Sequence, residues 1–74
     1  MSRKHPKVNA RQLIKILEQK GFTFSRQSGS HAIYIYEEGL RTTVPIHGKK
    51  ELGIGLLKQI MKDTDLSIED LENL

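Results

Sequence analysis

Residues 22–36 read FTFSRQSGSHAIYIY, and this stretch decides the fold. Polar residues alternate with aromatic ones over residues 22–26, which is typical of a half-buried strand. Residues 31–36 are rich in β-branched and aromatic side chains and predict a second strand. A glycine turn at residues 27–29 separates the two segments. The stretch therefore predicts an antiparallel hairpin.

A third strand is predicted at residues 40–46, after a second turn at residues 37–39. Alternation places four residues of this segment on one face: Leu40, Thr42, Val44 and Ile46. Pro45 cannot donate a ladder hydrogen bond, so the strand lies at an edge or ends there. Two successive tight turns make a three-stranded meander.

The segment before the hairpin predicts a helix over residues 10–20. Asn9 is a suitable N-cap, and Gln12 stands three residues later, in capping-box position. Leu13, Ile14 and Leu17 recur at helical spacing. Gly21 provides a left-handed stop.

Two further helices are predicted after the third strand. The first runs from residue 50 or 51 to residue 63, and Gly53 on its apolar face suggests close packing against the sheet. A short helix follows at residues 68–73, with Ser67 and Asp70 at capping spacing.

These elements predict an α+β fold of order α-β-β-β-α plus a short C-terminal helix. Both long helices have one apolar face, so they should cover the same face of the antiparallel sheet. With 74 residues the chain can form one small domain, predicted at residues 9–74, after a flexible basic arm at residues 1–8.

The charge of the chain is uneven. Residues 1–50 hold ten Lys and Arg against three acids (+7), and residues 51–74 hold two against six (−4), which gives the net +3. A basic body favours a polyanion such as nucleic acid. The chain has no cysteine, no signal-peptide pattern and no apolar run of bilayer length. We therefore expect a cytoplasmic protein without membrane contact.

His31 is the main candidate for catalysis, because histidine is the side chain that most readily exchanges a proton near neutral pH. Strand alternation places it with Ile33 and Ile35 at the rim of the helix-covered face, roughly opposite Pro45. Tyr34 and Tyr36 would then lie on the other face. We expect them to pack there against cross-strand neighbours, namely Thr23, Ser25, Arg41 and Thr43.

Two regular hairpins bring five residues to one end of the sheet: Arg26, His31, His47, Lys49 and Lys50. The start of the second long helix aims its free N–H groups at the same end, which suits a phosphate. A purely structural interpretation remains open, in which His31 is a hydrogen-bonded rim residue, His47 an ordinary loop residue and the lysines a solvated loop.

Several other chemistries are disfavoured. The three histidines are far apart in sequence with no carboxylate at helical ligand spacing, so no metal site is expected. There is no cysteine nucleophile and no P-loop. Ser30 precedes His31 on a strand and should face the opposite side. Metal-free acid–base chemistry remains, and RNA suits it because its 2′-hydroxyl is an internal nucleophile.

The chain also resembles a known family over residues 8–71. The central fragments are Gly29-Ser30-His31 with Tyr34, Val44-Pro45-Ile46-His47, Lys50-Glu51-Leu52, Gly55-Leu56-Leu57 and Ile60-Met61-Lys62. The helix–Gly–aromatic opening at residues 13–24 and the late segment Leu66-Ser67-Ile68-Glu69-Asp70 fit as well. In this order and spacing they resemble the HicA toxins. The resemblance implies a fold similar to a double-stranded RNA-binding domain, cleavage of mRNA with His31 as the catalytic residue, no cofactor, and a HicB-type antitoxin that covers the site.

We therefore expect a ribonuclease toxin in which His31 moves the proton. Six residues are expected to position the RNA: Gly29, Ser30, Arg26, His47, Lys49 and Lys50. The carrier of the second proton stays open between His31 itself, His47, water and a substrate group. The rival hypotheses are a non-catalytic RNA-binding module of the same fold and a protein-interaction domain for an acidic partner.

Overall fold

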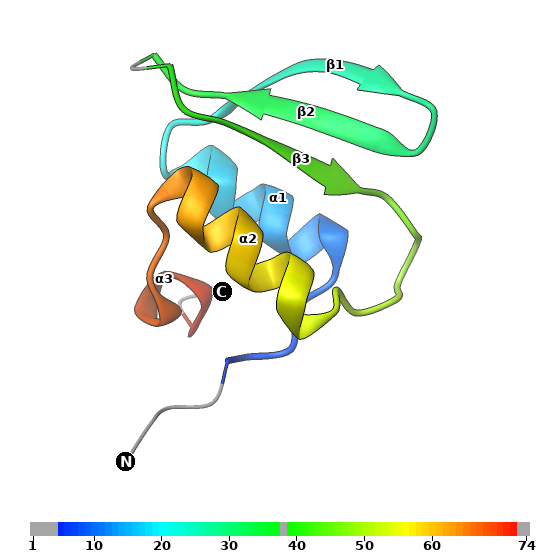
Figure 1. Ribbon diagram of the computed structural model, residues 1–74, viewed down its shortest axis with the longest axis vertical. Helices are drawn as coiled ribbons and strands as arrows, with labels where there is room; N and C mark the ends of the chain where they lie inside the picture. Colours follow the sequence, from blue (N-terminus) through cyan, green and yellow to red (C-terminus); the bar gives the residue numbers. More distant parts are fainter. Residues whose placement is uncertain (1–4, 38, 73–74) are drawn as a thin grey trace.

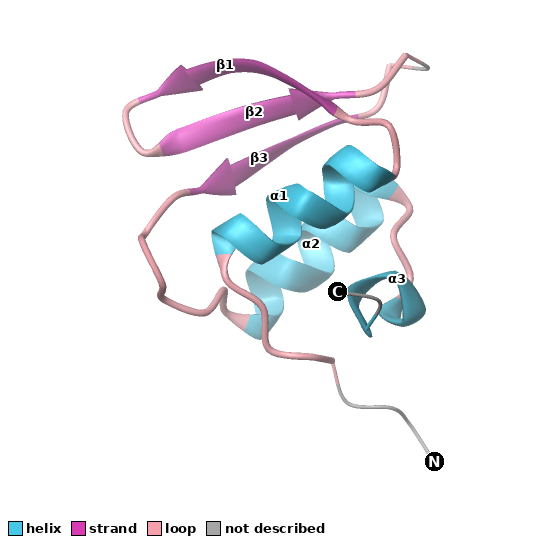
Figure 2. Cartoon of the chain, turned by 180° about the vertical axis from the view of Figure 1, so that it is seen from behind, coloured by secondary structure: helices cyan, strands magenta, loops and turns pink. Residues whose placement is uncertain are grey.

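The computed structural model describes residues 5–37 and 39–72 and has the element order α-β-β-β-α-α (Figure 1). The elements are α1 (Ala10–Gln19), β1 (Thr23–Ser28), β2 (His31–Ile35), β3 (Arg41–Pro45), α2 (Ile54–Thr64) and α3 (Ile68–Glu72). The sheet forms one layer, and the helices lie together on one side of it (Figures 1 and 2). The predicted α+β architecture is confirmed.

The three strands form an antiparallel sheet in the order β1-β2-β3. His31 pairs with Pro45, as the sequence predicted, and with Ser28 on the other side. The turn between β1 and β2 has Gly29 at a φ of +58°, a left-handed conformation that glycine adopts without steric cost. A β-bulge interrupts the β1–β2 ladder between Phe24 and Arg26.

The helix-covered face of the sheet is not the predicted one. Tyr34 pairs with Thr42, and both are buried, as are Ala32 and its partner Val44. Because paired residues share a face, the covered face carries Ala32 and Tyr34, and His31 lies on the uncovered face with Ile33 and Ile35. The expectation that His31 shares the helix-covered face is therefore wrong.

The physical reason is that β2 is apolar on both faces. Ile35 is 42% exposed on the uncovered face. Ile33 is 9% exposed, with Arg26 and Thr43 paired to it on its two sides, yet it lies outside the core cluster. Alternation separates the two faces of a strand, but it cannot say which face the helices cover.

The tyrosines pack with the phenylalanines. The Tyr34 ring meets Phe24 edge-on at 5.7 Å between centroids, and the Tyr36 ring stacks on Phe22 at 5.2 Å. The expected packing against Thr23, Ser25, Arg41 and Thr43 is therefore wrong. Burial of its phenol, and secondarily the Glu18 carboxylate, raises the pKa of Tyr34 above its usual value.

Helix α1 begins as predicted. The Asn9 side chain accepts from the Gln12 N–H, and the Gln12 side chain accepts from the Asn9 N–H, both at 2.9 Å. The helix ends at Gln19 with Lys20 as its C-cap. Gly21 follows at a φ of +100°, where a Cβ atom would lie 2.9 Å from the Tyr36 ring. The glycine stop is therefore required both by backbone conformation and by space.

Helix α2 begins at Ile54, three or four residues later than expected. The preceding chain instead packs beside the start of α1. Glu51 forms an isolated bridge with Asn9, and the Leu52 N–H donates to the Val8 carbonyl at 2.8 Å. Gly53 is the exposed N-cap, with open space where a Cβ atom would be. Its expected close packing against the sheet is wrong.

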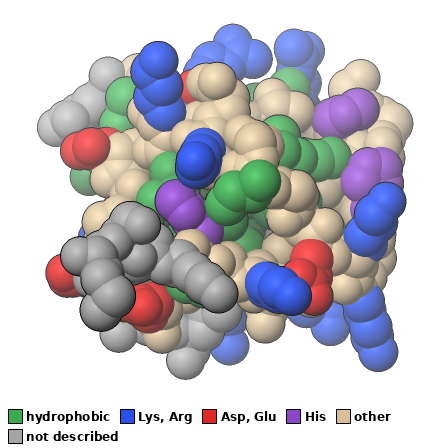
Figure 3. All heavy atoms as spheres, turned by 60° about the horizontal axis from the view of Figure 1, so that its bottom comes forward, with side chains coloured by type: hydrophobic (Ala, Val, Ile, Leu, Met, Phe, Trp, Pro, Cys, Tyr) green, Lys and Arg blue, Asp and Glu red, His purple; other side chains and the backbone are tan. Residues whose placement is uncertain are grey.

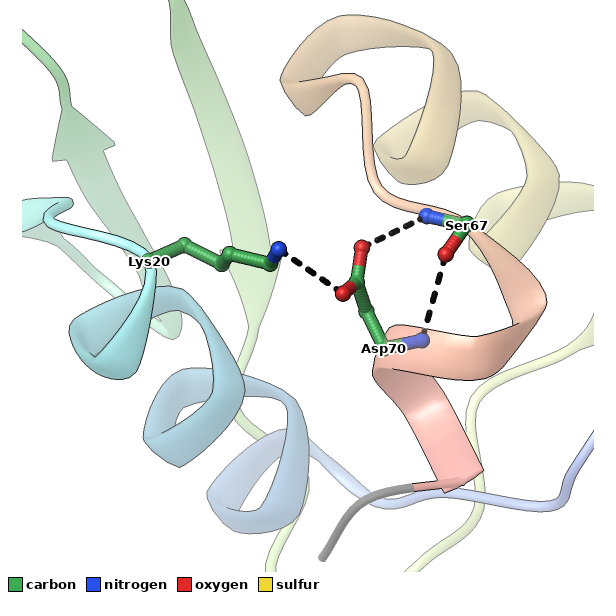
Figure 4. A network of polar contacts seen from close by, with 3 residues as sticks. All are labelled: Lys20, Ser67 and Asp70. Carbon is green, nitrogen blue, oxygen red and sulfur yellow. Dashed lines mark hydrogen bonds and ion pairs between the residues drawn. The ribbon is translucent and has the colours of Figure 1, made fainter.

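The hydrophobic core includes residues before α1 and after α2. Val8, which was assigned to the arm, is fully buried, and residues 1–4 of that arm lie outside the described residues. The N-terminus of helix α3 is capped by reciprocal hydrogen bonds between Ser67 and Asp70. Asp70 also forms an ion pair with Lys20 (Figure 4). Residue 73 of the predicted helix is not described. Over the described ranges, no helix is long and apolar enough to cross a membrane.

Candidate active site

His31 is the first residue of β2, and its side chain is exposed. It follows the tight turn at Gly29 and Ser30, which also stays open, because a Cβ atom on Gly29 would meet no atom within 4 Å. The Gln27 side chain donates to the Gly29 carbonyl at 3.0 Å and braces the turn. The imidazole therefore sits at a strand end with free access from solvent.

His47 lies beside the same strand end. The Ile46 N–H donates to the Ser30 carbonyl at 2.6 Å, one step beyond the His31–Pro45 pair, so His47 lies just past the end of the β2–β3 ladder. His47 is exposed like His31. Figure 3 shows two histidine side chains near each other on one side of the molecule, with a lysine or arginine side chain beside them.

Arg26 reaches the face of His31 because of the β-bulge. In a regular ladder Phe24 and Arg26 would share a face. The bulge places Arg26 opposite Ile33, whereas Phe24 pairs with Tyr34 on the covered side. Since Ile33 and His31 lie two residues apart on one strand face, the bulge adds a guanidinium to the surface that carries the candidate catalyst.

A small pocket of about 180 Å³ lies beside His47. Its lining includes Pro45, which pairs with His31, together with His47 and Lys50. The N-terminus of α2 forms the far wall through Gly53 and Leu56. No side chain caps this helix end, so its first N–H groups remain available for an anion.

Lys49 lies apart from this group. It lines a separate groove between α1 and the chain after β3, beside Arg11 and Lys15. The structure therefore brings His31, His47 and Lys50 to one end of the sheet with Arg26 on the same face, whereas Lys49 serves another surface. The sequence interpretation missed that groove, although two cations one helical turn apart on α1 were a signal for it.

The described side chains do not converge as metal ligands do: no three His, Cys, Asp or Glu residues form a group that could hold an ion. Tyr34 lies on the covered face, away from the surface that carries His31. The exposed imidazoles at this end are those of His31 and His47, and the Glu51 carboxylate lines the pocket beside His47.

A family model described as the HicA toxin of bacterial toxin–antitoxin matches residues 10–66, which is well over half of the chain. No curated protein matches the sequence. The chain belongs to the HicA toxin family. It is accordingly a toxin, and its family implies an antitoxin partner.

Proposed function

We propose that this toxin is an endoribonuclease that cleaves mRNA without a metal ion, with His31 as the catalytic residue. The observation that carries the proposal is the exposed His31 on the uncovered sheet face, next to His47 and to cations. Membership of the toxin family and the basic charge of residues 1–50 support it.

In the proposed reaction, His31 removes the proton of the 2′-hydroxyl. The 2′-oxygen then attacks the adjacent phosphorus, and the bond from phosphorus to the 5′-oxygen breaks. The leaving 5′-oxygen takes a proton from His47, the other exposed imidazole at this strand end. The products are a 2′,3′-cyclic phosphate and a 5′-hydroxyl. A placed histidine contributes about 100- to 10,000-fold to such proton transfers.

Charge near the reacting phosphate has three sources in this arrangement. Arg26 approaches across the uncovered face, and Lys50 with the N-terminus of α2 approaches from the small pocket. Fixed positive charge and N–H donors stabilise the extra negative charge that develops on the phosphate oxygens. Gly29 and Ser30 leave the approach to His31 open, as a bound RNA strand requires.

The decisive experiment compares wild type with His31→Ala on a 5′-labelled single-stranded RNA and on DNA of the same sequence. We expect wild type to cut the RNA alone and leave cyclic phosphate ends. His31→Ala should lose at least about 100-fold in rate, whereas His5→Ala, in a pocket that neither His31 nor His47 lines, should be unchanged. Cleavage by His31→Ala at the wild-type rate would remove His31 from the mechanism.

The rival functions have their own outcomes in this assay. RNA that binds to wild type but stays intact would identify a non-catalytic RNA-binding module. Absence of any RNA binding would favour a protein-interaction domain. His47→Ala tests the second proton: we expect a lower cleavage rate with unchanged RNA affinity.

We further propose that the antitoxin is of the HicB type and binds the sheet face that the helices leave free, around His31. That face carries Ile35, which is 42% exposed, in addition to the candidate catalyst. An antitoxin seated there would block access of RNA to His31. Inhibition of cleavage by the purified antitoxin, and its loss in an Ile35→Asp variant, would test this arrangement.

A further inference from the structure

A groove of about 800 Å³ runs between α1 and the chain that follows β3. We call it the α1 groove and define it by six lining residues: Arg11, Ile14, Lys15, Glu18, Ile46 and Lys49. Its volume lies in the range of sites that hold small organic molecules, which is about 300 to 1,000 Å³. It is separate from the small pocket next to His47.

The rim of the α1 groove is cationic. The lining contains three cationic side chains and one carboxylate, which gives a net charge of +2; they are Arg11, Lys15, Lys49 and Glu18. Within residues 5–37 and 39–72, none of the three cations makes a side-chain hydrogen bond or an ion pair. Arg11 and Lys15 also lie one helical turn apart, where like charges destabilise a helix. An anionic ligand would relieve that repulsion.

The floor of the groove is apolar. Ile14 and Ile46 are half-buried and pack against the hydrophobic core, which fixes their position. An apolar floor with a cationic rim suits a nucleotide, because a base can pack its apolar face on the isoleucines while phosphates contact Lys and Arg. An acidic peptide could contact the same rim, and the test treats it as the alternative occupant.

The α1 groove and the small pocket lie along the same segment of chain after β3. Ile46, Gly48 and Lys49 line the groove, whereas Pro45, His47 and Lys50 line the pocket. An RNA strand that passes from His31 across this segment reaches the groove.

We propose that the α1 groove binds one nucleotide of single-stranded RNA that flanks the cleaved bond. The base packs on Ile14 and Ile46, and the flanking phosphates contact Arg11, Lys15 and Lys49. This inference rests on the proposed ribonuclease function and adds a substrate-binding subsite to it.

The test uses two double variants of the full chain with identical charge loss. Arg11→Gln with Lys15→Gln alters the groove, and Lys58→Gln with Lys62→Gln makes the same change one turn apart on exposed positions of α2 that line none of the groove. Affinity for a labelled single-stranded RNA is measured in the His31→Ala background, so that no cleavage interferes. KM and kcat are measured with His31 present.

We expect the groove variant to bind RNA about tenfold more weakly and to raise KM with little change in kcat. The slope of log affinity against log salt should become shallower by about 1.4, since each single-strand phosphate contact contributes about 0.7. The α2 variant should stay within twofold of its parent. Unchanged thermal unfolding midpoints would show that both variants are folded.

An RNA affinity of the groove variant within twofold of its parent would overturn the inference, as would an equal loss in the α2 variant. A groove variant that loses only antitoxin affinity would overturn it in favour of a peptide site. The ribonuclease proposal is tested separately, because it fails when the wild-type protein leaves RNA uncut, regardless of the RNA affinities of the groove variant and the α2 variant.

Discussion

Asp70 connects the C-terminal helix to the end of α1. Its carboxylate contacts the Lys20 ammonium at 2.8 Å and accepts from the Ser67 N–H at 2.9 Å (Figure 4). The Lys20 contact has the larger effect and the Ser67 hydrogen bond the smaller one, and both hold the pKa of Asp70 below its usual value. A lowered folded-state pKa means that the ionised carboxylate stabilises the fold above the unfolded-state pKa, near 4. This stabilisation disappears as the pH falls through the folded-state pKa.

We predict that Asp70→Asn lowers the free energy of unfolding at pH 7 by about 1 kcal/mol, the scale of one ion pair plus a charge at a helix N-terminus. The difference from wild type should shrink toward pH 3. Urea unfolding at both pH values measures it. Asp65→Asn, an equal charge change at the C-cap of α2, should cost less than about 0.5 kcal/mol. Equal losses in the two variants would contradict a role for the Lys20 contact.

At the scale of the elements, the β-bulge in β1 has the largest effect on the candidate site. It makes Ser25 the extra residue and moves Arg26 to the face of His31. Strict alternation of residues 22–26 could not reveal it, because one inserted residue changes the face of everything beyond it. Proximity of Arg26 to His31 was expected from the hairpin, but the bulge is what provides it.

The delayed start of α2 is a second element-scale effect. Leu52 has the spacing of the apolar face of the predicted helix, yet Glu51 and Leu52 bond to the chain at Asn9 and Val8 instead. Two glycines at positions 53 and 55 weaken the competing helical turn. The resulting loop carries His47 and Lys50 to the pocket beside His31's strand end.

Gly55 has no structural requirement for glycine. It is the second residue of α2, it is exposed, and a Cβ atom there would meet nothing within 4 Å. We predict that Gly55→Ala raises the free energy of unfolding by about 0.5 kcal/mol, because alanine loses less backbone entropy in a helix. Gly48→Ala should have the opposite sign, since Gly48 has a φ of +62°. Urea unfolding of both variants checks this, and a destabilised Gly55→Ala would refute it.

At the scale of the whole molecule, the core extends beyond the segment that the family model matches. The match covers residues 10–66, whereas Val8 and Leu71 are 0% and 1% exposed in the same core cluster. Helix α3 thus completes the layer opposite the sheet, and its position against α1 is held by the contact of Asp70 with Lys20.

We predict that Leu71→Ala lowers the free energy of unfolding by about 3 kcal/mol, because it removes a fully buried side chain and leaves a cavity. Leu56→Ala is the matched control: Leu56 is 37% exposed on α2, and its loss should cost less than about 1 kcal/mol. Denaturant unfolding followed by circular dichroism measures both. A cost below 1 kcal/mol for Leu71→Ala would mean that α3 is not part of the cooperative core.

The order of the elements, the turn at Gly29 and the pairing of His31 with Pro45 were determined by the amino-acid sequence itself, because each depends on residues close along the chain. Only the tertiary structure decided which face of β2 the helices cover. Both faces are apolar, and the choice depends on total burial of Ala32 and Tyr34 against the helices. The α1 groove belongs to the same class, since α1 and the chain after β3 are distant in sequence. The bulge at Ser25 is local to the β1–β2 hairpin, but the alternation of residues 22–26 does not mark it.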